Sequence, residues 1–166
     1  MESGLPYTFV TAIYFMQNTL AVAPTVASAG TIYMPMKDGK VGIIDARDVA
    51  EAVATVLTSD GHEGKSYLLT GPESISVHDV ADTLSRVLGN EVKYVNVPPE
   101  GAKEAMLGMG LPAWVADGII ETAGALSEGL GDYTTDDFEK LTGHRANSYE
   151  TFARDFSQVF GGVVQI

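Results

Sequence analysis

The stretch SGLPYTFVTAIYF, residues 3–15, decides the fold of this chain. It predicts a tight turn followed by a β-strand that is apolar on both faces, with Tyr7 and Phe9 near its start and Tyr14 and Phe15 at its end. Strands of this kind lie inside parallel sheets that helices cover on both sides. A parallel neighbour needs a crossover of a dozen or more residues. We therefore expect either that later strands flank this one, or that a preceding half of the domain supplies its neighbour.

Strand and helix patterns alternate downstream of this strand as far as residue 98, and only helical patterns follow. We expect strands at 31–36, 41–44, 65–70 and 91–97, and helices at 15–29 (interrupted at Pro24), from Asp45 to Ser59 and from Ser76 to Gly89. The later helices are expected at 100–109, 112–126, 135–141 and 148–160. This order predicts an α/β domain with a helical appendage.

The helix that begins at Asp45 carries the clearest local signals. Asp45 is an expected N-cap, and Asp48 three residues later predicts a capping box with a short acid. Its apolar positions predict a buried stripe: Val49, Ala50, Val53, Ala54, Val56 and Leu57.

Charge and cysteine content exclude several classes of function. The chain of 166 residues has 22 acidic and 10 basic residues and a formal net charge of −12. Binding to nucleic acid or an anionic membrane needs clustered Lys and Arg, so we expect neither partner. There is no cysteine, which excludes disulfides, thiol nucleophiles and cysteine-type metal sites and fits a cytoplasmic protein.

Targeting segments and metal sites are also not expected. Residues 1–23 have no basic amino-terminal region, and polar residues interrupt their apolar run, so they predict neither a signal peptide nor a membrane span. The three histidines, His62, His78 and His144, are far apart in the sequence and predict no metal site.

One motif matches in form only. Tyr33 and Lys37 have the Tyr-x-x-x-Lys spacing that places a phenol and an ammonium on one face of a helix. Pro35 and the pair Asp38-Gly39 favour a strand and a turn here, and residues four apart in a strand are about 13 Å apart. We interpret the match as coincidence.

Two polar groups follow the ends of predicted strands. Tyr14, Gln17 and Asn18 lie past the carboxyl end of the first strand, where ligands bind in open α/β sheets. The alternative is that Gln17 and Asn18 cap a helix and Tyr14 lies in the core. Residues 45–48 follow a later strand, and they predict either helix capping with Arg47 on the surface or a substrate-facing Arg47.

The order of these segments resembles a known family. Residues 3–8 and 14–18 resemble the segment SGLPYT-hhRPGxFMQN of the NmrA-like family of atypical short-chain dehydrogenase/reductases. Residues 44–50 resemble its hDVRDVA junction and residues 64–73 its GKxYxLTGPE strand and turn, with 92–98 and 110–114 similar to later elements. The family includes NAD(P)H:quinone oxidoreductases and redox-sensing regulators.

The resemblance implies a fold and a function. Residues 1–98 would form the late half of a Rossmann-like parallel sheet, and residues 99–166 a helical substrate-side subdomain of the same globule. The function would be hydride transfer from NADP or NAD to a quinone or a similar carbonyl or enone. The substrate-binding residues would be Tyr14, Phe15, Met16 and Asn18, with no catalytic residue assigned. The alternative is a non-catalytic NmrA-like protein that regulates or binds a partner.

The resemblance also implies what this sequence lacks. The Gly-rich nucleotide loop of the family would lie upstream of the matched segments, and no G-x-G-x-x-G occurs here. The sequence would thus correspond to the carboxyl-terminal half of the family fold. The Arg-Pro of the family is replaced by Thr11-Ala12. A first strand without its usual neighbour would leave an open apolar edge, so we expect a homodimer or association with a separate partner through it.

Overall fold

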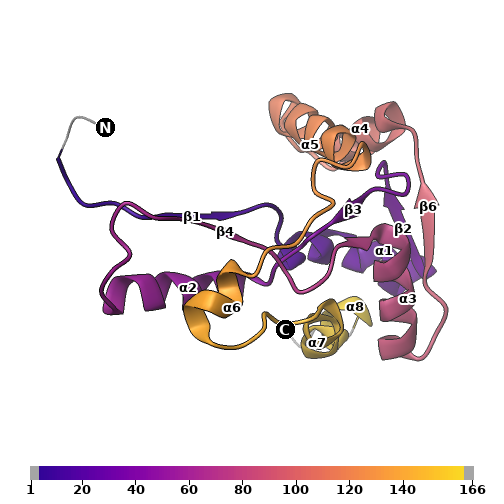
Figure 1. Ribbon diagram of the computed structural model, residues 1–166. Coiled ribbons are helices and arrows are strands. Elements are labelled where there is room, and N and C mark those ends of the chain that lie inside the picture. Colours follow the sequence, from indigo (N-terminus) through magenta and orange to yellow (C-terminus); the bar gives the residue numbers. More distant parts are fainter. Residues whose placement is uncertain (1–3, 163–166) are drawn as a thin grey trace.

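The strands form three pairs rather than one continuous sheet. The structure is a computed structural model that describes residues 4–162 (Figure 1). Two pairs are parallel: β1 (Phe9–Ala12) with β4 (Ser66–Leu69), and β2 (Thr31–Met34) with β6 (Lys93–Asn96). The third pair, β3 (Lys40–Val41) with β5 (Ile75–Ser76), is antiparallel. The predicted α/β class with parallel pairing is confirmed, and β5 is a strand that the sequence did not indicate.

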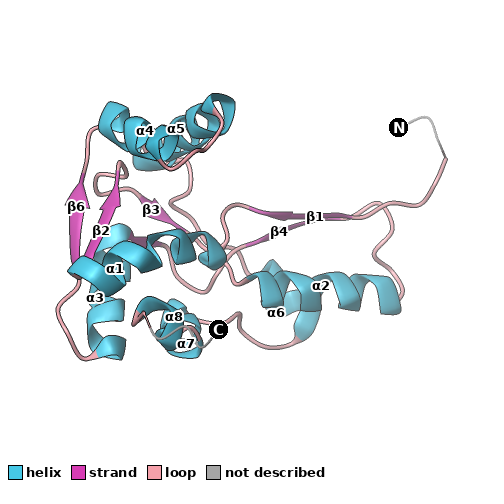
Figure 2. Ribbon diagram, turned by 180° about the vertical axis from the view of Figure 1, so that it is seen from behind, coloured by secondary structure: helices cyan, strands magenta, loops and turns pink. Residues whose placement is uncertain are grey.

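The β1–β4 pair forms an arm that extends from the rest of the molecule. The helices α2 (Ala46–Thr58) and α6 (Asp137–Thr142) lie along one side of it in both views (Figures 1 and 2). A small core of Ile44, Ala52, Leu69 and Phe138 fills the space between them. The inward residues of β1 pack against this core.

The larger core lies around the other two strand pairs. It is enclosed by the 3₁₀ helix η1 (Met16–Val22) and by α1 (Ala23–Ala29), α3 (Val77–Leu88), α7 (Tyr149–Asp155) and α8 (Ser157–Phe160). The carboxyl-terminal helices therefore pack back onto the strand-containing part. In contrast, α4 (Pro99–Gly108) and α5 (Ala113–Ser127) form a hairpin on which Met109 and Trp114 are exposed.

Local sequence signals explain most element boundaries. Ser76 and Asp79 form a complete capping box at the start of α3, and this bonding holds the pKa of the Asp79 carboxyl below its usual value. Gly30 and Gly89 end α1 and α3 in the left-handed conformation. Pro24 lies in the first turn of α1, where its missing N–H costs nothing, so the predicted interruption of the 15–29 helix is confirmed.

Three expectations about the arm are wrong. Asp45 caps α2, but the Asp48 side chain binds Asn147 instead of closing a capping box. The predicted α2 stripe is largely exposed, with Leu57 78% exposed. Only one face of β1 is covered by helices of the described residues, and Phe9 on the other face is 50% exposed. The last two errors have the same physical origin, because the sequence pattern indicates burial that residues 4–162 do not supply. The Asp48 error differs, since a contact with the distant Asn147 occupies the carboxylate.

Two further observations complete the fold. No helix between residues 4 and 162 is both long enough and apolar enough to cross a membrane. Ser3 of the predicted first turn lies outside the described residues, whereas Gly4 has a φ of 66°, as a turn glycine does.

Candidate functional site

The carboxyl end of β1 leads directly into the first predicted site. The chain bends after Ala12, and Phe15 then pairs with Ile44 in a single parallel bridge. The Met16 N–H donates to the Ile44 carbonyl at 2.9 Å, and the Ile44 N–H donates to the Tyr14 carbonyl at 3.0 Å. These bonds fix the backbone from which the predicted substrate residues project.

The four predicted substrate residues differ in accessibility. Phe15 is 39% exposed, Asn18 is exposed and Tyr14 is partly buried. Met16 is 1% exposed and belongs to the larger core, where its terminal methyl lies close to Gly71. Phe15 and Asn18 are therefore accessible from solvent, whereas Met16 serves as packing.

The Tyr14 hydroxyl is suited to donating a hydrogen bond. Burial raises the pKa of the Tyr14 phenol above its usual value, and the hydrogen bond with the Asn18 side chain opposes part of this increase. The phenol is consequently neutral at pH 7. A neutral phenol next to an amide side chain can donate to a carbonyl oxygen that is held nearby.

Gln17 has a structural role. Its Nε2 donates to the Asp45 Oδ1 at 2.8 Å, and its Oε1 accepts from the Ala46 N–H at 3.0 Å. One amide side chain thus binds both the cap and the first turn of α2, and joins η1 to that helix. The capping interpretation of Gln17 therefore fits the geometry better than the ligand-binding one. The helix that Gln17 caps is α2, and not the helix in which Gln17 lies.

Asp45 is the buried centre of this network. Its side chain is fully buried, and it accepts from the Arg47 N–H at 2.9 Å and from the Arg47 guanidinium at 2.6 and 2.9 Å. Burial alone would raise the pKa of this carboxyl. The hydrogen bonds from Arg47 and Gln17 outweigh burial, so the pKa lies below its usual value.

Arg47 connects α2 to the carboxyl-terminal helices. Its Nη1 donates to the Asp155 carboxylate at 2.7 Å, and its guanidinium carbon lies 5.8 Å from the centre of the Phe156 ring. The side chain is half exposed, but both of its hydrogen-bonding edges are occupied. The structural interpretation of Arg47 therefore fits this geometry better than the substrate-facing one.

Asp48 makes a second connection that sequence patterns did not reveal. The Asn147 N–H and Nδ2 both donate to its carboxylate, at 2.8 and 2.6 Å, and the carboxylate is almost fully buried. Burial raises the pKa of Asp48, and the two bonds from Asn147 counteract this effect. Since the two residues are 99 positions apart, no local pattern could have predicted the pair.

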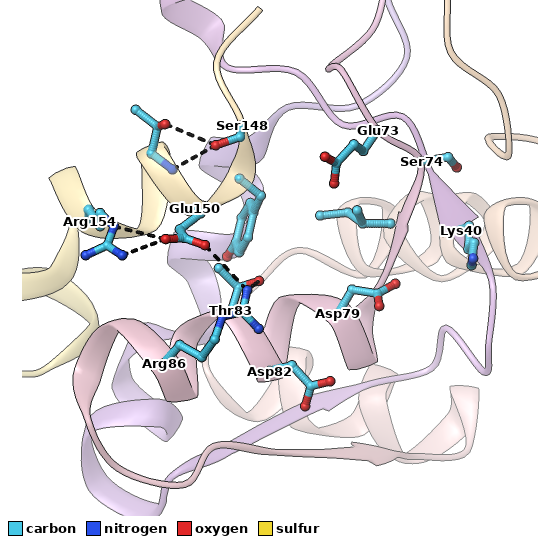
Figure 3. A pocket seen from close by; sticks show the side chains of 13 residues that line it. Lys40, Glu73, Ser74, Asp79, Asp82, Thr83, Arg86, Ser148, Glu150 and Arg154 are labelled. Atoms are coloured by element: carbon cyan, nitrogen blue, oxygen red, sulfur yellow. Dashed lines mark hydrogen bonds and ion pairs between the residues drawn. The ribbon is translucent and has the colours of Figure 1, made fainter.

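Two clefts lie outside this region. The first, of about 520 Å³, lies between α3 and α7, and Figure 3 shows Glu150 in it between Arg154 and Arg86. The second, of about 590 Å³, lies where β4 ends and includes Thr70, Gly71 and Asp137. Neither lining includes Tyr14, Phe15 or Asn18. In this first cleft Glu150 pairs with both Arg154 and Arg86, and Asp79 is held in the capping box with Ser76.

Other candidate groups are occupied within the protein. Tyr33 lies in β2 and Lys37 follows it with its Nζ 2.6 Å from Glu128, so the helical phenol–ammonium pair does not form. Residues 4–162 contain no cluster of three metal-ligating side chains. In the same part of the chain, every buried side-chain nitrogen and oxygen has a hydrogen-bond partner. No buried polar group there awaits a ligand.

Comparison with known proteins identifies a family and several related sequences. The sequence model of the NmrA-like family matches residues 1–153. The chain is 40% identical over 160 residues to an NAD(P)H azoreductase of Xenophilus azovorans, which covers 96% of this chain and 56% of the relative. It is 32% identical to quinone oxidoreductase 2 of Escherichia coli over 96% of this chain and 54% of the relative.

Solved structures agree with this result. An NADPH-dependent quinone oxidoreductase of Escherichia coli in complex with NADPH matches with a TM-score of 0.86 at 28% identity, over 94% of this chain and 55% of that one. A triphenylmethane reductase of Citrobacter sp. in complex with NADP(H) matches with a TM-score of 0.81 at 28% identity, over 91% and 53%. The chain thus spans about half the length of the relatives that it matches.

Proposed function

This chain belongs to the NmrA-like family, and from that premise we propose that it forms the substrate-side part of an NAD(P)H-dependent reductase of quinones or similar flat electron acceptors. The observation that carries the proposal is the exposed Phe15 ring just past the carboxyl end of the parallel strand β1, in the segment where the Tyr14 and Asn18 side chains bond to each other. The azoreductase, quinone oxidoreductase and dye reductase relatives support the substrate class.

The chemistry divides between cofactor and protein. A bound nicotinamide would supply the hydride. In the proposal, the Phe15 ring stacks against the flat acceptor, because offset stacking of aromatic rings is favourable. The neutral Tyr14 phenol and the Asn18 amide donate to the acceptor's carbonyl oxygen and thereby orient it.

We infer that the described residues do not hold the pyrophosphate of the cofactor. A pyrophosphate needs a Gly-rich turn that leads into a helix N-terminus, and the sequence has no G-x-G-x-x-G. The residues that hold NADP or NAD would correspond to the part of the relatives that this chain does not cover. We propose a cytoplasmic location, where both nucleotides are available.

We expect the 166-residue chain alone to bind neither NADPH nor NADH with useful affinity. The reason is the missing pyrophosphate turn. Isothermal titration calorimetry at pH 7 measures this directly, with the Escherichia coli quinone oxidoreductase as a positive control for NADPH. A dissociation constant in the low micromolar range for the chain alone would contradict the expectation.

We expect a naphthoquinone to perturb the amide signals of Phe15 and Asn18 in an NMR titration of the chain. Replacing Phe15 with Ala should weaken binding roughly five- to tenfold, because an aromatic contact is worth about 1 kcal/mol beyond its buried area. Tyr33→Ala is the matched control, since Tyr33 is an exposed aromatic residue on β2. Shifts confined to α4 and α5, with Phe15→Ala binding normally, would place the substrate elsewhere.

The regulatory alternative is less well supported. Structures of NmrA, a negative transcriptional regulator, match at 20–22% identity with TM-scores of 0.63–0.65, which is evidence of a common fold alone. The azoreductase, the two quinone oxidoreductases and the triphenylmethane reductase, at 28–40% identity, are named as reductases or oxidoreductases. Sequence similarity therefore favours the enzyme.

A further inference from the structure

The 3₁₀ helix η1 has one face in the core and one face toward solvent. In a 3₁₀ helix, side chains three residues apart lie on the same face. Met16 and Thr19 form such a pair, and both are buried, at 1% and 8% exposure. Phe15 at the N-cap and Asn18 are both exposed, and the Asn18 N–H donates to the Phe15 carbonyl at 3.1 Å. The orientation of the exposed residues therefore depends on what anchors the buried pair.

Two buried hydroxyl groups anchor η1 from the core side. The Thr19 Oγ1 donates to the Met16 carbonyl at 2.7 Å and accepts from the Tyr149 hydroxyl at 3.0 Å. Burial raises the pKa of the Tyr149 phenol above its usual value, so the phenol is a neutral donor at pH 7. Because Thr19 and Tyr149 are 130 positions apart, their bond joins the first turn of η1 to α7.

The position of Tyr149 is itself fixed by α2. Tyr149 is the first residue of α7, after the N-cap Ser148. One residue before the cap, the backbone N–H and the side-chain Nδ2 of Asn147 both donate to the buried Asp48 carboxylate of α2. The Tyr149 phenol therefore reaches Thr19 from a helix start that two hydrogen bonds hold in place.

The residues on both sides of Asn18 are thus held by other elements. Gln17 binds the first turn of α2 through its side-chain amide, and Thr19 binds α7 through Tyr149. Asn18 itself is exposed and bonds to the Tyr14 phenol. A side chain whose two neighbours are fixed loses little freedom when a ligand binds, and such preorganisation favours binding.

We propose that Tyr149 and Thr19 are positioning residues of the acceptor site, because the bond between their hydroxyls holds η1 in the place where Asn18 meets Tyr14 and the carbonyl oxygen of the acceptor. Both residues are buried, so they act through Asn18 and not by touching the acceptor. The identity of the ligand rests on the proposed function, whereas the effect on Asn18 is a property of the chain without ligand.

The first test uses the chain without ligand. Tyr149→Phe keeps the ring and removes the hydroxyl, and the Thr19 hydroxyl keeps its bond to the Met16 carbonyl, so the variant should fold. We expect hydrogen exchange of the Asn18 N–H, followed by NMR, to become at least about threefold faster, since a hydrogen bond of ordinary net strength corresponds to roughly a fivefold change in an equilibrium constant. Thr19→Ser, which keeps a hydroxyl at this position, should restore exchange close to the wild-type rate.

Tyr94→Phe is the matched control. It removes a phenol hydroxyl on β6 that donates to the Met34 carbonyl, so it also costs the fold a hydrogen bond. It should leave exchange at Asn18 and the affinity for a naphthoquinone unchanged. In Tyr149→Phe, the dissociation constant of the naphthoquinone should increase at least about threefold, because a contact residue is no longer fixed.

Three results would overturn the proposal. The first is a folded Tyr149→Phe chain in which Asn18 exchanges as in the wild type. The second is equally fast exchange of Asn18 in Tyr94→Phe, which would indicate a general loss of stability. The third is an unchanged naphthoquinone affinity in a Tyr149→Phe chain with faster exchange. If the naphthoquinone fails to bind the wild-type chain, the proposed function is contradicted instead, and the exchange rates still decide whether Tyr149 positions Asn18.

Discussion

Gly71→Ala should destabilise the chain by about 3 kcal/mol or more, which is among the largest effects we expect from a single methyl group. A Cβ at Gly71 would lie far inside contact distance of the Ile43 carbonyl oxygen. The clash is with backbone rather than with a flexible side chain, so the segments that follow β3 and β4 would have to move apart. The Gly71 N–H also donates to the Gly42 carbonyl at 3.2 Å, and that bond would be strained as well.

Urea unfolding followed by circular dichroism measures this loss, which corresponds to a decrease of about 6–12 °C in Tm for a chain of this size. Gly118→Ala in α5 is the matched control, because no atom lies within 4 Å of its added Cβ. That variant should be stabilised by about 0.5–1 kcal/mol, since Ala favours a helix more than Gly does. Equal stability of the two variants would show that the segments carrying Ile43 and Gly71 can move apart at little cost.

Gly71 also illustrates which features of the fold can be predicted from the sequence. The family resemblance implies a strand and turn at residues 64–73, and the chain bends at residues 72–73, but the reason for Gly71 is its close approach to Ile43, which lies on a distant segment. Positions and types of elements follow from local signals such as the Ser76 capping box and the Gly30 helix end. Contacts between distant segments do not leave such signals.

The candidate site divides in the same way. The place of Tyr14 and Phe15 at a strand end follows from the pattern of the first strand, whereas the bonds of Gln17 to α2 and of Asp48 to Asn147 required the structure. The wrong predictions of burial at β1 and α2 have another cause. Their residues have the apolar pattern of buried elements, but the described part of the chain does not cover them. The residues are apolar as the pattern indicates, but residues 4–162 supply no cover for the outer face of β1.

Arg47→Ala should destabilise the chain by about 2–3 kcal/mol at pH 7, more than Asp45→Asn does. Removal of Arg47 leaves the fully buried Asp45 carboxylate without two charge-assisted hydrogen bonds, and an uncompensated buried charge is costly. Asn at position 45 still caps α2 about as well as Asp, and the half-exposed Arg47 keeps its bond to Asp155. We expect a loss of about 1–2 kcal/mol for that variant.

The pH dependence distinguishes this electrostatic explanation from simple loss of packing. In the wild type the pKa of Asp45 is lowered, so its contribution to stability is complete above the usual carboxyl pKa of about 4 and decreases as the pH falls through the folded-state value. Without Arg47, burial should raise the pKa of Asp45, and protonation then relieves the uncompensated charge. The stability difference between wild type and Arg47→Ala should therefore shrink between pH 7 and pH 3 in urea titrations. Arg154→Ala, which removes an exposed ion pair with Glu150, is the control for general charge effects. A difference for Arg47→Ala that stays constant over this range would mean that the side chain acts through its packing on Phe156 rather than through Asp45.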